Sequence, residues 1–387
     1  MTFFHRKIKF KSPPKIDILI FERLGSQRIE NIVLPGSPAY IFDSKLEEVF
    51  VSVKIIYYFI IYLRHFRLQG VGDVRKLGNE VLGQLWRIYI LSCIKGFLPK
   101  VVVTSIDNYS VFHWLCAHYP DAEFMAIQNG SRTRVEFKGR KMPYRIGHLF
   151  CFGKYEQDMY SELGYKIDHY YPVGSLLASY YKYRDTEKSA PEYDICVVSC
   201  WRGNIGNGPD VQRTMESMRK MDLFISRYIQ EYELKASVLL RSAPDSPDRC
   251  IPVYGDEKDY YKGIYPESAV LISPDFKERN IYREMDKSNF IVSFGSTAVR
   301  EAFGWGKKVL YCDFTGTKLY NDYDPVILFE TENYDLFKKR FNEIRGMPYE
   351  EYRRDTKAYA AYVMGYDFNC PAHLFIRQKI TQYASRL

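Results

Sequence analysis

Residues 290–310 constrain the fold of this 387-residue chain more than any other stretch. The apolar run at 290–292 predicts a buried parallel strand, and small residues then form a turn that leads into a predicted helix. A second strand is predicted to begin at Lys308. Strand, tight turn, helix and strand make up half of a nucleotide-binding sheet, so we expect the same alternation elsewhere in the chain.

The turn itself has the chemistry of a phosphate site. It offers backbone N–H groups, the positive end of a helix dipole and side-chain hydroxyls. Ser296 or Thr297 can cap the helix, and Glu301, one turn further on, can reach a ribose. The alternative is a capped helix of an ordinary α/β protein, with no ligand at its start.

Apolar strand-like runs alternate with helical patterns along the whole chain. In the first half the predicted strands are 15–21, 99–105, 123–128 and 148–152, and the predicted helices are 109–118 and 154–163, with a helix-rich stretch at 46–97. In the second half the strands are 193–199, 236–240, 269–272, 290–292, 308–311 and 326–329, and the helices are 215–232, 334–345 and 349–364. This alternation predicts parallel sheets that are covered on both faces.

The length of the chain predicts two domains, because one ordinary core does not grow to this size. We expect an N-terminal Rossmann-like domain at 1–173, a linker at 174–192 and a C-terminal Rossmann-like domain at 193–387, whose last helix can pack back on the first domain. The fold class is therefore α/β, with two doubly wound domains. The carboxyl ends of their strands should face each other across a cleft.

Composition limits the partners. With 46% apolar and 26% charged residues, the chain has the balance of a soluble globular protein. The net charge of +8 favours anionic partners such as phosphorylated ligands or acidic lipid headgroups. The positive charge is spread along the chain in short clusters, so we expect no nucleic-acid partner.

The cysteines and the apolar stretches bear on location. None of the eight cysteines forms a Cys-x-x-Cys pair, which is typical of reduced cysteines in a cytoplasmic protein. The first residues are basic and lack the apolar core of a signal peptide. Residues 55–63 are too short to cross a bilayer, which takes about 20 residues. We favour a buried helix there. A helix on a membrane surface is the alternative, so contact with the inner face of the membrane is expected to be peripheral at most.

Several motifs resemble GT-B glycosyltransferases. Val198-Ser-Cys-Trp-Arg-Gly203, Leu239-Leu-Arg-Ser242 and residues 293–309 are similar to the donor domain of that fold. Thr104-Ser-Ile-Asp-Asn108, Ala126-Ile-Gln-Asn-Gly-Ser-Arg132 and His148-Leu-Phe-Cys-Phe-Gly-Lys154 are similar to its acceptor domain. More narrowly, the chain resembles bacterial surface-polysaccharide transferases that are grouped with Kdo, sialyl and glycerophosphate transferases.

The resemblance implies a reaction. A sugar would move from a nucleotide-activated donor on the C-terminal domain to a surface-glycan or lipid-linked acceptor on the N-terminal domain, with no metal and no cofactor besides the nucleotide-sugar substrate. Many members of the group carry a His-Pro pair after the second strand of the donor domain, where this chain has Arg241-Ser-Ala-Pro244. Arg241 can clamp a phosphate there and keeps its charge at any pH.

The predicted catalytic residue is Asp107. It follows a buried strand, where a carboxylate can deprotonate an acceptor hydroxyl or stabilise an oxocarbenium-like sugar. The alternative is a helix cap. The predicted acceptor-binding residues are Asn108, Gln128, Asn129, Gly130 and Arg132. The predicted donor-binding residues are Trp201, Arg202, Gly203, Asn204, Arg241, Ser242, Gly295, Ser296, Thr297 and Glu301.

Three other readings stay open. The first is a sugar-nucleotide 2-epimerase or hydrolase on the same two-domain frame. The second is a glycerophosphate-type transferase, and the third is a non-catalytic nucleotide-binding or assembly protein. Asp322-Tyr-Asp324 has the form of a metal-binding Asp-x-Asp motif, but it lies in a polar loop, and we expect no metal site.

Overall fold

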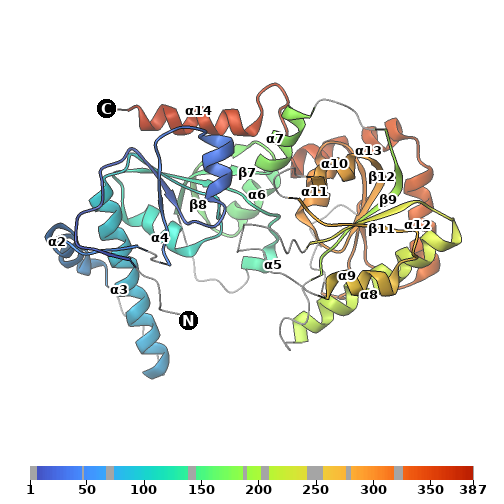
Figure 1. Cartoon of the computed structure of the whole chain (residues 1–387), viewed down its shortest axis with the longest axis horizontal. Helices are drawn as coiled ribbons and strands as arrows, with labels where there is room; N and C mark the ends of the chain where they lie inside the picture. The colour runs from blue at the N-terminus through green and yellow to red at the C-terminus, as the bar shows by residue number, and fades with distance from the viewer. Residues whose placement is uncertain are drawn as a thin grey trace.

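The chain folds into two α/β domains, each built on a six-stranded parallel sheet (Figure 1). The structure is a computed structural model that describes residues 7–45, 48–66, 74–137, 145–185, 190–201, 209–241, 256–275, 280–317 and 326–386. Within these residues the predicted fold class, two Rossmann-like domains, is confirmed.

The N-terminal sheet has the strand order β3-β2-β5-β6-β7-β8. Its strands are β2 (Ile18–Phe21), β3 (Tyr40–Phe42), β5 (Val101–Thr104), β6 (Glu123–Ile127), β7 (Arg145–Cys151) and β8 (Lys166–Pro172). The chain runs outward from β2 to one edge and then returns to continue from β5 to the other edge. The order therefore reverses between β2 and β5, and this is where an open α/β sheet forms a ligand crevice.

The C-terminal sheet has the order β11-β10-β9-β12-β13-β14, with its reversal between β9 and β12. Its strands are β9 (Tyr193–Val198), β10 (Ala236–Leu239), β11 (Val270–Ile272), β12 (Ser288–Ser293), β13 (Lys308–Cys312) and β14 (Leu328–Phe329). Because every neighbouring pair is parallel, the carboxyl ends of all strands lie on one edge of each sheet.

Helices cover both sheets. Those of the first domain are α1 (Ser26–Arg28), the π-helix η1 (Ile29–Val33), α2 (Val53–Tyr62), the 3-10 helix η2 (Leu63–His65), α3 (Val74–Phe97), α4 (Ser110–His118), α5 (Arg134–Phe137), α6 (Lys154–Glu162) and α7 (Leu176–Arg184). Those that follow are α8 (Pro209–Glu231), α9 (Glu257–Ile264), α10 (Asn280–Asp286), α11 (Thr297–Gly304), α12 (Tyr334–Gly346), α13 (Tyr349–Val363) and α14 (Ala372–Ala384). A short parallel pair, β1 (Lys7–Lys9) and β4 (Glu48–Phe50), lies outside both sheets.

The last helix belongs in space to the first domain. Figure 1 shows α14 lying across the N-terminal domain, where it contacts η1, α7 and β5. Ile376 and Ile380 are buried against Ile20 and Val103 of the sheet, and Arg377 Nε donates to the Val33 carbonyl at 2.6 Å. The chain therefore crosses between the domains twice.

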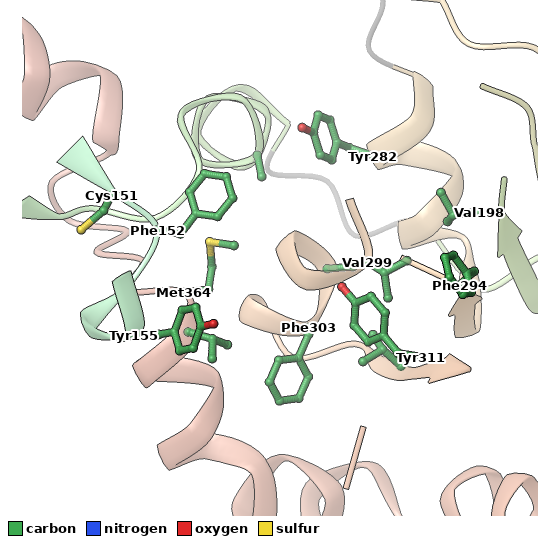
Figure 2. Packing of buried hydrophobic residues seen from close by; sticks show 14 of the residues in the cluster. Cys151, Phe152, Tyr155, Val198, Tyr282, Phe294, Val299, Phe303, Tyr311 and Met364 are labelled. Atoms are coloured by element: carbon green, nitrogen blue, oxygen red, sulfur yellow. The ribbon is translucent and has the colours of Figure 1, made fainter. Parts of the chain in front are cut away.

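The two domains share an apolar junction. Figure 2 shows Met364 beside Phe152 and Tyr155 of the first domain, with Val299 and Phe303 of α11 facing them. Gly153 lies so close to this segment that a Cβ atom there would be 2.2 Å from the Tyr362 carbonyl oxygen. A side chain at this position would force the domains apart.

Two expectations need correction. The stretch predicted as a linker contains α7, because Ser175 caps a turn of apolar residues that pack under α14. The stretch at 55–63, for which we favoured burial, forms most of α2, and burial holds for one side only: Ile55 and Tyr62 are buried, whereas Ile56 and Ile60 are exposed. No helix of the described residues has both the length and the apolar character needed to cross a membrane.

The close approach at Gly153 gives a test of the junction. We expect Gly153→Ala to lower the free energy of unfolding by about 1–3 kcal/mol, because a methyl group there overlaps backbone atoms. Gly263→Ala in α9 is the matched control: nothing lies within 4 Å of its added Cβ. Urea unfolding of both variants measures the effect, and equal stabilities would contradict the close packing.

Candidate functional site

Glu22 occupies the crevice of the N-terminal sheet. It follows β2 directly, at the point where the strand order reverses. Its φ angle is +79°, a left-handed conformation that glutamate rarely adopts, and its side chain is only 5% exposed. A buried carboxyl on strained backbone at this point of the sheet is typical of a functional residue. Sequence reasoning missed it, although a glutamate directly after the first apolar strand was a usable signal.

The surroundings of Glu22 favour its protonated form. Burial raises the pKa of this carboxyl to about 7, and the nearby Asp43 carboxylate acts in the same direction. The Ser44 N–H donates to Glu22 Oε1 at 3.2 Å, and the Ser44 hydroxyl lies 2.9 Å from that of Tyr109. A carboxyl group with a pKa near neutrality can accept a proton and release it again.

A cavity of about 170 Å³ lies beside this crevice. Its lining residues are Arg23, Tyr40, Ile41, Phe42, Asp43 and Glu48. Arg23 follows Glu22 in the chain and Asp43 comes directly after β3, so the cavity is next to Glu22 along the edge of the sheet.

Asp107 has a different environment from the one predicted. Its side chain is fully buried, and Arg132 binds both carboxylate oxygens, with Nε donating to Oδ2 at 2.9 Å and Nη2 donating to Oδ1. The Asn129 N–H donates to Oδ1 and the Tyr160 hydroxyl to Oδ2, each at 3.3 Å. The carboxylate is therefore enclosed by its partners, whereas the predicted catalytic role needs an oxygen that faces a ligand, so that role stays a prediction.

The loop after β6 carries most of the predicted acceptor residues. Gln128 is buried and its amide joins the loop to the segment after β7: Oε1 accepts from Phe152 N at 2.8 Å, and Nε2 donates to the Gly130 carbonyl at 2.8 Å and to Glu156 Oε1 at 3.1 Å. The exposed Asn129 accepts from Arg132 Nη2 at 2.8 Å. Asn108 lies apart from these contacts and donates to Glu136 at 2.6 Å. Gln128 thus shapes the loop, while Asn129 faces solvent.

The side chain of Ser293 builds the turn after β12. Ser293 Oγ donates to the Val198 carbonyl at 2.8 Å, which joins β12 to β9. The N–H groups of Gly295 and Ser296 donate to Ser293 Oγ at 3.4 and 3.3 Å. Ser296 caps α11 by accepting from Ala298 N, as expected. This turn lies at the reversal of the C-terminal sheet.

Glu257 organises the neighbouring strand ends. Its carboxylate accepts from the Ser199 hydroxyl and from the Arg241 N–H, which places Trp201 and Arg241 side by side, with Arg241 Nη1 3.4 Å from the Trp201 carbonyl. The Trp201 ring stacks on Tyr260 with centroids 4.0 Å apart. Both predicted residues therefore lie at the carboxyl ends of β9 and β10, next to the turn after β12.

Other predicted residues lie outside the described ranges. These are Arg202, Gly203, Asn204 and Ser242, together with the Asp322-Tyr-Asp324 motif. Over the parts of the chain that the structure describes, no group of three His, Cys, Asp or Glu side chains could hold a metal ion.

Glu301 is directed away from the turn. It is buried at the domain junction, where it accepts from the Ser175 hydroxyl and, at 3.0 Å, from the Tyr282 hydroxyl. Burial raises its pKa to about 7. These contacts connect α11 with the start of α7 and with α10, so Glu301 holds the junction instead of reaching toward a ribose.

The two domains touch where the loop after β6 contacts the turn after β12. The Ser131 N–H donates to Thr297 Oγ1 at 3.0 Å, and a Cβ on Gly130 would lie 3.5 Å from the same hydroxyl and 3.4 Å from Arg132 Nη1. Arg132, Gly130 and Thr297 therefore come together from different domains. A ligand on the turn would have the guanidinium of Arg132 beside it.

The fold has solved counterparts, although the sequence matches no protein-family model and no curated protein. A putative UDP-N-acetylglucosamine 2-epimerase from Listeria monocytogenes superimposes with a TM-score of 0.53 at 14% identity, with 95% of each chain covered. A second UDP-N-acetylglucosamine 2-epimerase gives a TM-score of 0.50 at 15% identity over 97% of this chain and 98% of the other. A glycosyltransferase from Rickettsia africae gives 0.47 at 11% identity over 95% and 98%, a score too low to carry an argument. At such identities the likeness shows the fold alone. That fold is GT-B.

The environment of Asp107 predicts a loss of stability on substitution. Asp107→Asn leaves the buried charge of Arg132 uncompensated, which costs about 3–5 kcal/mol. The control is Asp121→Asn, whose side chain is 53% exposed and whose partner Lys95 is 2.6 Å away. It should cost no more than about 1 kcal/mol. An Asp107→Asn variant with unchanged melting temperature but lost turnover would favour the catalytic role after all.

Three buried carboxyl groups predict a pH dependence of stability. The third group, Asp222, is buried on α8, where it accepts from the Tyr260 and Tyr265 hydroxyls, each at 2.9 Å. Burial raises the pKa values of Glu22, Glu301 and Asp222 to about 7, so in the folded state they hold protons that the unfolded state has lost. The stabilising contribution of these protons is present below the unfolded pKa, near 4, and is lost as the pH rises to about 7. We expect a lower free energy of unfolding at pH 7.5 than at pH 5.5. A profile without this decline, or one unchanged in Glu22→Gln/Glu301→Gln/Asp222→Asn, would contradict it.

Proposed function

We propose that this chain is a glycosyltransferase that moves a sugar from a nucleotide-activated donor to a hydroxyl of a surface-glycan or lipid-linked acceptor, without a metal ion. The observation that carries the proposal is Glu22, a buried carboxyl with a raised pKa at the strand reversal of one domain, in a fold whose other domain has a phosphate-type turn at its own reversal.

Glu22 is the base in this proposal. The acceptor occupies the cavity beside it and offers a hydroxyl to its carboxylate. As the acceptor oxygen bonds to the anomeric carbon, its proton passes to Glu22 and the anomeric C–O bond to the phosphate breaks. A base with a pKa near the working pH is efficient, because it is ionised before the step and basic enough to take the proton.

The donor lies on the C-terminal domain in this proposal. The turn after β12 and the start of α11 present the Thr297 hydroxyl and the positive end of the helix dipole to the phosphates of the nucleotide. Arg132 comes from the opposite domain and is held by Asp107. The guanidinium of Arg132 stabilises the negative charge that develops on the leaving phosphate. A metal ion would otherwise have to stabilise that charge.

If Glu22 is the base, its substitution should lower turnover without lowering the affinity for the nucleotide. We expect Glu22→Gln to lower kcat by about 10²–10⁴, while nucleotide affinity is retained, because only the proton transfer is removed. The wild-type kcat should rise with pH through an apparent pKa near 7, the value to which burial raises the pKa of Glu22. Quench-flow or coupled assays with a nucleotide-sugar and an active acceptor measure both.

Glu233→Gln is the matched control for this experiment. Glu233 also has a positive φ angle, +50°, but it is exposed. It lies between α8 and the amino end of β10, on the edge of the sheet opposite to the carboxyl ends of the strands. Its variant should keep full turnover. Near wild-type turnover in Glu22→Gln would reject Glu22 as the base and leave Asp107 as the next candidate to test.

A sugar-nucleotide 2-epimerase is the second candidate, since the solved structures of similar fold include enzymes of that name. The two reactions differ in their need for an acceptor. An epimerase exchanges the proton at C2 of UDP-N-acetylglucosamine in heavy water with no acceptor present, whereas a transferase leaves C2 unlabelled. Mass spectrometry of the recovered nucleotide-sugar decides between them. A melting-temperature screen with CDP and other nucleotides then separates a sugar transferase from a glycerophosphate-type transferase.

A further inference from the structure

One side of α2 exposes a row of apolar side chains. Its members, with their exposed fractions, are Val53 (85%), Ile56 (51%), Tyr57 (59%) and Ile60 (62%). They are three or four residues apart, so they share one side of the helix, while Ile55 and Tyr62 on the other side are buried and α2 packs on α3. A contiguous apolar surface of this kind marks an interaction site.

Two further exposed apolar side chains lie on and directly after β1. Ile8 and Phe10 are 57% and 83% exposed. The Val51 N–H donates to the Lys9 carbonyl at 2.9 Å and the Ser12 and Ser52 hydroxyls lie 3.1 Å apart, so these residues adjoin the start of α2. We call Ile8, Phe10, Val53, Ile56, Tyr57 and Ile60 the α2 face. Figure 1 shows α2 at the end of the molecule remote from the C-terminal domain.

The α2 face is surrounded by positive charge. Residues 7–17 and 48–66 contain six lysine or arginine side chains and two carboxylates, a net charge of +4. Both carboxylates already have partners: Glu48 pairs with Lys9 at 2.6 Å and Asp17 with Lys100 at 3.6 Å. The exposed cations are Lys7, Lys11, Lys15 and Arg64.

We propose that the α2 face docks on an anionic phospholipid surface, with α2 lying in the plane of the headgroups. An apolar row bordered by lysine and arginine fits the boundary between acyl chains and acidic headgroups. A second copy of the chain fits less well, because it would bring another +4 charge to the same contact. Ten residues of helix span only about 15 Å, half of a bilayer core, so α2 lies on the surface and does not cross it.

The docking face adjoins the cavity that we assign to the acceptor. Glu48 lines that cavity, accepts a hydrogen bond from the Tyr40 hydroxyl and pairs with Lys9 of β1. A lipid surface at the α2 face would therefore lie on the Glu48 side of the cavity. The docking inference itself stands on the exposed residues and their charge and does not require the proposed reaction.

Vesicle co-sedimentation tests the inference without any turnover. The full chain should bind vesicles of phosphatidylcholine with 30% phosphatidylglycerol, bind pure phosphatidylcholine weakly, and release from the anionic vesicles as salt rises. Ile56→Ser/Ile60→Ser should weaken binding to the anionic vesicles at least about tenfold, because two apolar insertions are lost. Lys7→Glu/Lys11→Glu should weaken binding to the anionic vesicles more at low salt than at high salt.

The matched control is Leu336→Ser, whose side chain is 50% exposed on α12 of the other domain. It should bind vesicles like the wild type. Unchanged binding of Ile56→Ser/Ile60→Ser overturns the proposal, as does equal binding to neutral and anionic vesicles. A concentration-dependent dimer in sedimentation velocity that the same double variant abolishes would instead make the α2 face a self-interface. Nucleotide binding should be intact in every variant, so failure here leaves the proposed function unaffected.

Discussion

The buried ion pair between Arg300 of α11 and Glu156 of α6 fixes the position of the two domains relative to each other. The side chains are 1% and 0% exposed, and Arg300 Nη2 lies 2.8 Å from Glu156 Oε1. Arg300 also donates to the Val363 carbonyl at 2.7 Å, which ties the end of α13 to the same point. Removing either partner would leave a buried charge, and such a loss is far more costly than losing a surface pair.

This pair also determines the shape of the site. Glu156 accepts from Gln128 Nε2 at 3.1 Å and from Gly153 N at 3.0 Å, so the loop after β6 and the start of α6 are fixed by the same carboxylate that binds Arg300. The loop then presents Ser131 to Thr297 across the domains. The contact between the loop after β6 and the turn after β12 thus depends on the Arg300–Glu156 pair, which fixes the loop, and on the hydrogen bond from Ser131 to Thr297.

The fold could be predicted from the sequence because apolar strands and helical periods are local patterns. Capping of α11 by Ser296 was likewise a local property, and it is confirmed. The site was harder to predict from the sequence. Asp107 ends a strand as a catalytic carboxylate would, but its partner Arg132 is 25 residues away, and no local pattern showed that it would enclose the carboxylate. Glu301 was misplaced for the same reason, since Ser175 is 126 residues from it. Glu22 depends on Ser44 and on its own backbone angle, neither of which a sequence pattern displays.

The position of α14 has a consequence for how the chain is made. The apolar surface formed by Ile20, Val103 and Ile127 is covered by the last helix, which emerges from the ribosome only after the entire second domain. The first domain is synthesised first but completed last. Its newly made sheet must therefore wait with one apolar face uncovered, a state prone to aggregation, until α14 has been made. Cutting the chain between the domains would make that waiting state permanent for the N-terminal fragment.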